Sequence, residues 1–310
     1  MKTQLAVAAA LALFAAPAWP QSDNFTGRAT LTVLPAHPDT QDASLSAGQL
    51  NVKLDGKLAT VTSLTQLTSA NSPLELILLI DGGVRTSLYG QAGDIIDFVK
   101  EIPSNTQMAI AYMENGRAAL EGPLSSDPAA VEKELHMTAG GAGSNASPYF
   151  CLDDLATHWP STDANARRVV VMITDGIDEY NPHYDPDDVY VTSAINDTVH
   201  AGMVVFTIYW HDQGRADRSG GIADGGQNLM LEVAQATGGN SYWQGLSNPV
   251  SLKPYFDDLR RRLHSEYELD LSAPFKGKPF KASLKLRANA PNAKVTAPQF
   301  VYLSNAPAER

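Results

Sequence analysis

Two aspartates stand directly after apolar runs that are typical of buried strands. Asp81 follows "LELILLI" at residues 74–80, and Asp175 follows "RVVVMIT" at residues 168–174. Near-continuous apolarity without alternation favours parallel strands that are covered on both faces. Ligands of such open sheets bind beyond the carboxyl ends of the strands. Two carboxylates at that edge, together with hydroxyls and water, could hold a hard cation, so the spacing predicts a metal or ligand site there.

The elements that must position these aspartates alternate between strands and amphipathic helices. Further buried-type strands are expected at residues 108–113 and 203–210, and "NG" at 115–116 predicts a turn into a short antiparallel neighbour. Apolar residues recur at helical spacing at 88–99, 191–199, 229–236 and 252–263. Right-handed crossovers between such strands predict an α/β fold with a doubly wound, mostly parallel sheet.

Two β segments flank this core. Residues 22–70 contain "LNVKL" and "KLATV" joined by Asp55-Gly56, a pair that favours a type I′ hairpin turn. Residues 266–305 return to alternating patterns such as "FKASLKL". We expect the two segments to pair with each other into a small β subdomain beside the core of residues 72–264.

Composition narrows the class of protein. Residues 1–18 combine one lysine, an Ala/Leu run and "FAAPA", a pattern that predicts a cleavable signal peptide and a secreted or periplasmic protein without a membrane span. The chain has 34 acidic and 23 basic residues, a net charge of −11, which disfavours nucleic acid and anionic membranes as partners. Its single cysteine, Cys151, cannot form an intramolecular disulfide, which favours a bacterial source.

Three stretches together resemble a von Willebrand factor type A domain: "LLID…SLYG", "GGAGSNASPYF" and "VVVMITDG". The resemblance covers residues 72–264 and implies a Rossmann-like arrangement. With its flanking β segments, the mature chain is similar to the von Willebrand factor A-related proteins common in Acidobacteria. This family implies export and protein binding or cell adhesion rather than a defined activity. Its metal-ion-dependent adhesion site typically holds Mg²⁺, for which Mn²⁺ or Ca²⁺ can substitute, and a partner's carboxylate completes the coordination.

The family's Asp-x-Ser-x-Ser motif is only partly present. Asp81 matches the leading aspartate, and Asp175 matches the aspartate that follows the fourth strand. An alignment without a gap places Gly83 and Arg85 at the two serine positions. With two inserted residues, Ser87 of "SLYG" becomes the second serine, and the first serine is lost.

The remaining ligand comes from the middle loop, where we expect Ser147, with Ser144 as the alternative. The possible metal ligands are thus Asp81, Ser87, Ser147 and Asp175. Arg85 leaves a second alternative open, because a guanidinium near the two carboxylates competes with a divalent ion. The site then is a degenerate one that binds metal weakly or not at all, and Arg85, Ser87, Ser147 and Asp178 are the residues expected to contact a ligand or partner.

No sequence pattern for catalysis is present: there is no His-Glu-x-x-His, Gly-x-Ser-x-Gly or paired cysteine motif. We therefore expect a non-catalytic module that recognises a protein or extracellular ligand at the sheet edge. Two alternatives stay open, a metal-dependent hydrolase that uses the aspartates and His183, or a structural component of an envelope assembly. The acidic and aromatic stretch 175–190 is interpreted as a Ca²⁺ loop, although its spacing is not that of an EF-hand, as a surface that recognises a partner, or as a solvated loop. In the last case Asp187 or Asp188 caps the next helix.

Overall fold

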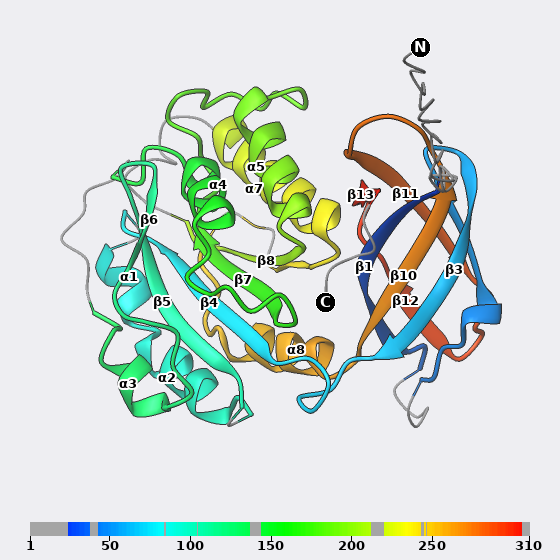
Figure 1. Cartoon of the computed structure of the whole chain (residues 1–310). Coiled ribbons are helices and arrows are strands. Elements are labelled where there is room, and N and C mark those ends of the chain that lie inside the picture. The colour runs from blue at the N-terminus through cyan, green and yellow to red at the C-terminus, as the bar shows by residue number, and fades with distance from the viewer. Residues whose placement is uncertain are drawn as a thin grey trace, which may run out of the picture.

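The structure, a computed structural model, describes residues 24–37, 43–83, 85–103, 105–136, 144–211, 220–242, 245 and 247–305. The predicted signal peptide at residues 1–18 lies outside this part. Figure 1 shows two parts side by side, a β-barrel and a layered unit in which helices cover a central sheet.

The terminal segments form the barrel. Its strands are β1 (Asn24–Pro35), β2 (Leu50–Leu54), β3 (Lys57–Gln66), β10 (Glu266–Pro274), β11 (Phe280–Ala288), β12 (Ala293–Thr296) and β13 (Phe300–Ser304), with a 3-10 helix η1 (Ala47–Gln49). Pairing runs β1–β10–β3–β2–β11–β13 and back to β1, antiparallel throughout, while β12 pairs with β1. Six strands therefore close on themselves.

Closure depends on a close approach at the short β1–β13 pairing, where Gly27 faces Leu303. A Cβ on Gly27 would lie 2.6 Å from a methyl carbon of Leu303, so a larger residue does not fit there without a shift. Inward-facing leucines such as Leu31 and Leu54 are wholly buried, and each contributes about 2 kcal/mol to folding.

The second part is a six-stranded mixed sheet with the order β6-β5-β4-β7-β8-β9. Its strands are β4 (Leu74–Asp81), β5 (Gln107–Glu114), β6 (Arg117–Leu120), β7 (Arg167–Thr174), β8 (Met203–Tyr209) and β9 (Ser241–Tyr242). The pairings of β4 with β5 and β7, of β7 with β8, and of β8 with β9 are parallel, whereas β6 is antiparallel to β5.

Helices cover both faces of this sheet (Figure 1). They are α1 (Arg85–Tyr89), α2 (Ala92–Glu101), α3 (Pro128–Glu132), α4 (Pro148–Thr157), α5 (Val189–His200), α7 (Gly220–Thr237) and α8 (Lys253–Leu263). One core cluster joins the face of Leu76 and Leu78 to α2 and α8, and the opposite cluster joins Ile77 and Leu79 to α4, α5 and α7. Alternate residues of β4 thus point to opposite covers, which explains its unbroken apolar run.

The expected fold class is wrong. We predicted a doubly wound, mostly parallel α/β sheet with a small flanking β subdomain. The terminal strands instead form a closed six-stranded antiparallel barrel, and the separate sheet is mixed because the hairpin at residues 115–116 adds an antiparallel edge strand. The physical reason is that period-two alternation shows which side chains share a face, but it does not show that a long strand such as β1 has partners on both sides.

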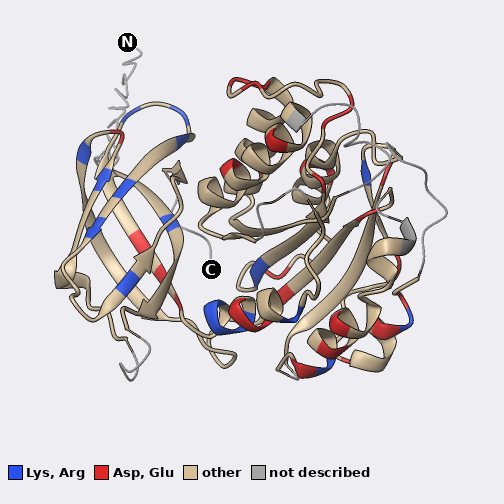
Figure 2. Ribbon diagram, turned by 180° about the vertical axis from the view of Figure 1, so that it is seen from behind, with Lys and Arg blue, Asp and Glu red and all other residues tan. Residues whose placement is uncertain are grey.

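The two parts differ in charge. Residues 72–264 contain 26 acidic and 12 basic residues, so most of the chain's negative charge belongs to the mixed-sheet part. Figure 2 shows several Lys and Arg residues along the barrel strands and many Asp and Glu residues on the helices and loops of the other part. Among the described residues, no helix is both long enough and apolar enough to cross a membrane.

Candidate functional site

Asp81 and Asp175 lie at the carboxyl edge of the mixed sheet, on neighbouring parallel strands. Asp81 is the last residue of β4, and Asp175 follows the last residue of β7. Both side chains are only 1% exposed. The two aspartates therefore converge at the end of the sheet, but neither carboxylate faces solvent.

The carboxylate of Asp81 connects three segments by hydrogen bonds. Its Oδ1 accepts from the backbone N–H of Gly83 at 2.8 Å. Its Oδ2 accepts from Asn145 Nδ2 and from the hydroxyl of Thr174, each at 2.8 Å. Asp81 thus ties the end of β4 to the loop at 144–147 and to the end of β7.

The loop at 144–147 is held in an unusual backbone conformation. Ala146 has φ 61°, in the left-handed region that non-glycine residues seldom adopt. Its carbonyl accepts from the backbone N–H of Glu179 at 3.1 Å. Ser147 caps α4, because its hydroxyl accepts from the N–H of Tyr149 at 3.3 Å. Asn145, in the same loop, is wholly buried.

Asp175 and Asp178 shape the loop that follows β7. Asp175 accepts from the N–H of Ile177 at 3.0 Å, and Asp178 accepts from the N–H of Tyr180 at 2.8 Å. Burial raises the pKa of Asp178, although the N–H of Tyr180 and the hydroxyl of Ser147 partly offset this effect. Both carboxylates act as acceptors for their own loop.

Tyr149 completes the buried network. Its hydroxyl donates to the carbonyl of Gly176 at 2.9 Å. Burial raises the pKa of this hydroxyl well above its usual value, and the nearby Asp178 and Asp175 carboxylates raise it further. Tyr149 therefore stays protonated and acts as a fixed donor between α4 and the loop after β7.

The structure separates the residues that we expected to contact a ligand. Ser147 and Asp178 are buried, at 0% and 1% exposed, so their side chains lie beneath the protein surface. Ser87 is exposed in α1, where its hydroxyl accepts from the indole N–H of Trp210 at 3.1 Å. The side chain of Arg85 lies outside the described part of the structure, as do residues 212–219.

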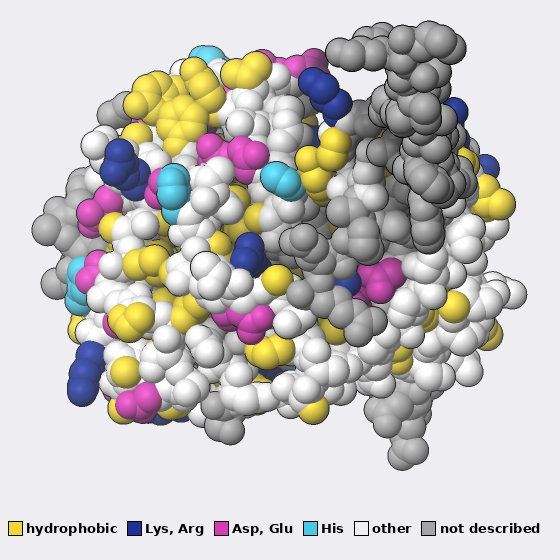
Figure 3. All heavy atoms as spheres, in the orientation of Figure 1, with side chains coloured by type: hydrophobic (Ala, Val, Ile, Leu, Met, Phe, Trp, Pro, Cys, Tyr) yellow, Lys and Arg dark blue, Asp and Glu magenta, His cyan; other side chains and the backbone are white. Residues whose placement is uncertain are grey.

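An exposed aromatic cluster lies beside this buried network. We use the name aromatic cluster for Phe150, Tyr180 and Tyr190, whose rings contact one another with centroid distances of 4.7 to 6.3 Å. Tyr180 is 63% exposed and Tyr190 is 38% exposed. Figure 3 shows hydrophobic side chains gathered near this edge of the molecule, with Asp and Glu side chains close by. Residue spacing within the stretch 175–190 does not predict that its tyrosines contact Phe150 of another segment.

The described residues supply only part of a family-type metal site. Asp81 Oδ2 already accepts from two donors, one of which is the amide of Asn145, and Gly83 replaces the first serine. Among the residues that the structure describes, no group of three or more His, Cys, Asp or Glu side chains could hold a metal ion. Asn145 and Thr174 were missed at the sequence level, because a lone amide in a loop and a strand-end threonine carry no pattern.

Two further residues, His183 and Cys151, do not add a reactive group to this network. His183 is exposed in the loop that leads into α5. Cys151 is buried in α4, and burial together with the nearby Asp81 raises the pKa of its thiol, which disfavours the reactive thiolate.

No protein-family model matches the chain, and no curated protein matches it. Among solved structures, the chain is similar to an aerotolerance-related membrane protein from Bacteroides fragilis, with 13% identity, a TM-score of 0.43, and coverage of 61% of this chain and 98% of that one.

This chain spans only about half the length of two other similar proteins. Proximal thread matrix protein 1 from the mussel byssus, which has zinc in its MIDAS motif, shares 15% identity with a TM-score of 0.44 over 68% of this chain and 50% of that one. The pilus adhesin SpaC from Lactobacillus rhamnosus shares 8% identity with a TM-score of 0.46 over 89% and 49%. TM-scores below 0.5 assign no family, so the relation to von Willebrand factor A domains stays a resemblance.

Proposed function

We propose that the chain is an exported, non-catalytic binding module that recognises a basic segment of a protein or extracellular ligand at the carboxyl edge of its mixed sheet. The observation that carries this proposal is the exposed aromatic cluster, which stands on a buried network of acidic residues. The chemistry of the surface, the charge around it and the rigidity of its support are separate arguments for it.

The aromatic cluster has the chemistry of an interaction surface. Tyrosine rings supply a large apolar area with few rotatable bonds, and they dominate the energetics of many interfaces. Tyr184, in the same loop as Tyr180, and Val189, at the start of α5, are also exposed, at 47% and 69%. Exposed aromatic rings that contact one another, as those of the aromatic cluster do, mark contact sites more often than isolated ones do.

The surrounding charge favours a cationic partner. The stretch 175–190 contains six acidic residues and no Lys or Arg, and Glu179, Asp185 and Asp187 are exposed. A lysine or arginine over a tyrosine ring is attracted by the π system, and neighbouring carboxylates add Coulomb attraction. The combination of rings and carboxylates therefore fits Arg- or Lys-bearing segments better than acidic ones.

The buried acidic residues give this surface its rigidity. Asp188 caps α5 by accepting from the N–H groups of Tyr190 and Val191, and its other oxygen accepts from Asn181 at 2.7 Å. Asp178 holds Tyr180 from the other end of the loop. Because rigid aromatic side chains lose little freedom on binding, this support favours affinity.

The experiment that tests the proposal measures binding to Arg- and Lys-rich peptides and to their Glu-substituted counterparts. We expect the basic peptides to bind more tightly, and the double variant Tyr180→Ser, Tyr190→Ser to bind them at least tenfold more weakly. Leu58→Ser, which removes a 65% exposed apolar residue from the barrel, is the matched control and leaves affinity unchanged. Equal binding of acidic peptides, or equal loss in the control, overturns the proposal.

A second measurement tests the absence of a metal requirement. Thermal unfolding with and without millimolar Mg²⁺, Mn²⁺ or Ca²⁺ is expected to give the same melting temperature, because an ion that binds the folded state would raise it. A rise that Asp175→Ala erases shows instead that the edge holds an ion.

A further inference from the structure

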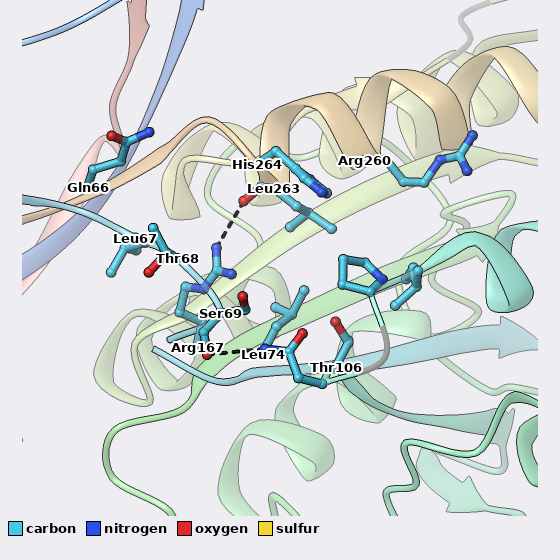
Figure 4. Close-up of a pocket in the computed structure, with 13 residues that line it drawn as sticks. Gln66, Leu67, Thr68, Ser69, Leu74, Thr106, Arg167, Arg260, Leu263 and His264 are labelled. Carbon is cyan, nitrogen blue, oxygen red and sulfur yellow. Dashed lines mark hydrogen bonds between the residues drawn. The ribbon is translucent and has the colours of Figure 1, made fainter. Parts of the chain in front are cut away.

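A cavity of about 210 Å³ lies at the other end of the mixed sheet, away from the aspartates. Figure 4 shows its lining, which comes from the start of β4, the loop before β5, the end of α8 and residues 66–69. Both chain connections between barrel and mixed sheet run past it, since residues 66–74 leave the barrel and residues 263–266 return to it. Junctions of this kind are preferred positions for ligand pockets.

The lining combines an apolar floor with polar and cationic groups. Leu74, Ile102 and Leu263 supply the buried apolar surface. Polar side chains at the rim include Ser69 and Asn105, and the amide of Asn105 donates to the carbonyl of Ser69 at 3.1 Å. The volume suits a small molecule rather than a peptide segment.

The charge of the lining is opposite to that of the part of the chain around it. Arg167, Arg260 and His264 line the cavity, and none of the described residues that line it is acidic. Arg260 is paired outside the lining with Glu101 and Asp257. In a segment with more than twice as many acidic as basic residues, a cavity lined by two arginines and, among the described residues, by no acidic group favours anions.

Arg167 is the group that can hold an anion here. Its side chain is 11% exposed, and it donates to the carbonyl of Leu263 at 3.0 Å (Figure 4). It also pairs with the buried Glu266, and its Nε, which is itself buried, has no hydrogen-bond partner among the described residues, so the donors of the guanidinium are not all used within the protein. Burial raises the pKa of Glu266 to about 7, so near neutral pH this carboxyl only partly compensates the guanidinium.

We propose that this junction cavity binds a small organic anion, with its apolar portion against Leu74, Ile102 and Leu263 and its charge at the guanidinium of Arg167. The site is independent of the carboxyl edge and of the function proposed there. A bound anion would contact both connections between the barrel and the mixed sheet.

The test is a ligand-observed NMR titration of the full chain with benzoate, with its neutral counterpart benzamide and with inorganic phosphate. We expect benzoate to bind with a dissociation constant on the order of 1 mM, and benzamide and phosphate at least tenfold more weakly. Ser69→Trp, which blocks the rim, should weaken benzoate at least tenfold. Ser193→Trp, on the exposed face of α5, is the matched control and should leave its affinity unchanged.

A charge-removing variant keeps the test independent of the rim. The double variant Arg167→Met, Glu266→Leu removes both charges together and so avoids a buried unpaired charge. It should bind benzoate and benzamide equally. Equal affinity of the wild type for both compounds, benzoate binding that survives Ser69→Trp, or no benzoate binding at tens of millimolar overturns the proposal.

Discussion

Replacing Asp81 tests whether this carboxylate is a structural acceptor. Asp81→Ala leaves three donors without their acceptor in a buried site, namely the N–H of Gly83, the amide of Asn145 and the hydroxyl of Thr174. Each unpaired buried donor costs about 1–3 kcal/mol, and shared relaxation makes the sum less than additive. We expect a loss of about 4 kcal/mol in the free energy of unfolding, or about 10 °C in melting temperature.

Urea denaturation in EDTA and in millimolar Mg²⁺ measures this loss. The account predicts the same loss in both buffers, and about half of it for Asp81→Asn, which keeps one acceptor oxygen. Asp97→Ala, an exposed aspartate of α2, is the matched control and should change stability by less than about 0.5 kcal/mol. A loss that appears only with Mg²⁺ would refute the reasoning, because Asp81 would then act through an ion.

Three further predictions concern stability. Burial and the adjacent Asp197 raise the pKa of Asp153 to about 7 from 3.8, so the folded state holds a proton that the unfolded state releases, and stability falls as pH rises from about 4 to about 7. Asp153→Asn should reduce that slope and gain about 1 kcal/mol at pH 8 after allowance for solvent screening; an unchanged urea-denaturation profile contradicts this. Arg167→Met alone should cost about 1–3 kcal/mol, because the buried carboxyl of Glu266 and the carbonyl of Leu263 lose their donor, and adding Glu266→Leu should restore part of this loss; a double variant as unstable as the single one shows that the pair is not coupled. A Cβ at Gly239 would overlap a backbone oxygen of β8, so Gly239→Ala should lower the melting temperature by several degrees, and an unchanged melt contradicts this packing.

Local signals in the sequence predicted local structure well. The turns at 55–56 and 115–116 form as expected, with positive φ at Asp55, Gly56, Asn115 and Gly116. Of the two candidates for the cap of the helix after residue 188, Asp187 and Asp188, it is Asp188 that caps α5. Each of these features depends on the chemistry of two to four neighbouring residues, which the sequence states directly.

The barrel could not be predicted in the same way. Its closure depends on Thr26 and Gly27 pairing with Ser304 and Leu303, almost the full length of the chain away. No local preference encodes such a pairing, and an open β subdomain satisfies the same alternation.

The candidate site was predicted only in outline. Strand ends located Asp81 and Asp175, because a charge that interrupts an apolar run is visible in the sequence. The amide of Asn145 donates a hydrogen bond to Asp81, and the ring of Phe150 contacts that of Tyr180. Both contacts join loops that belong to different crossovers. Tertiary packing decides these contacts, and residue spacing does not.

The most direct measurement is the affinity of the full chain for its best basic peptide in the presence of EDTA, compared with that of the variant that lacks both exposed tyrosines. The account predicts that the wild type binds as tightly as it does with Mg²⁺ and that the variant binds at least tenfold more weakly. Binding that EDTA abolishes, or that survives the loss of both rings, would contradict it.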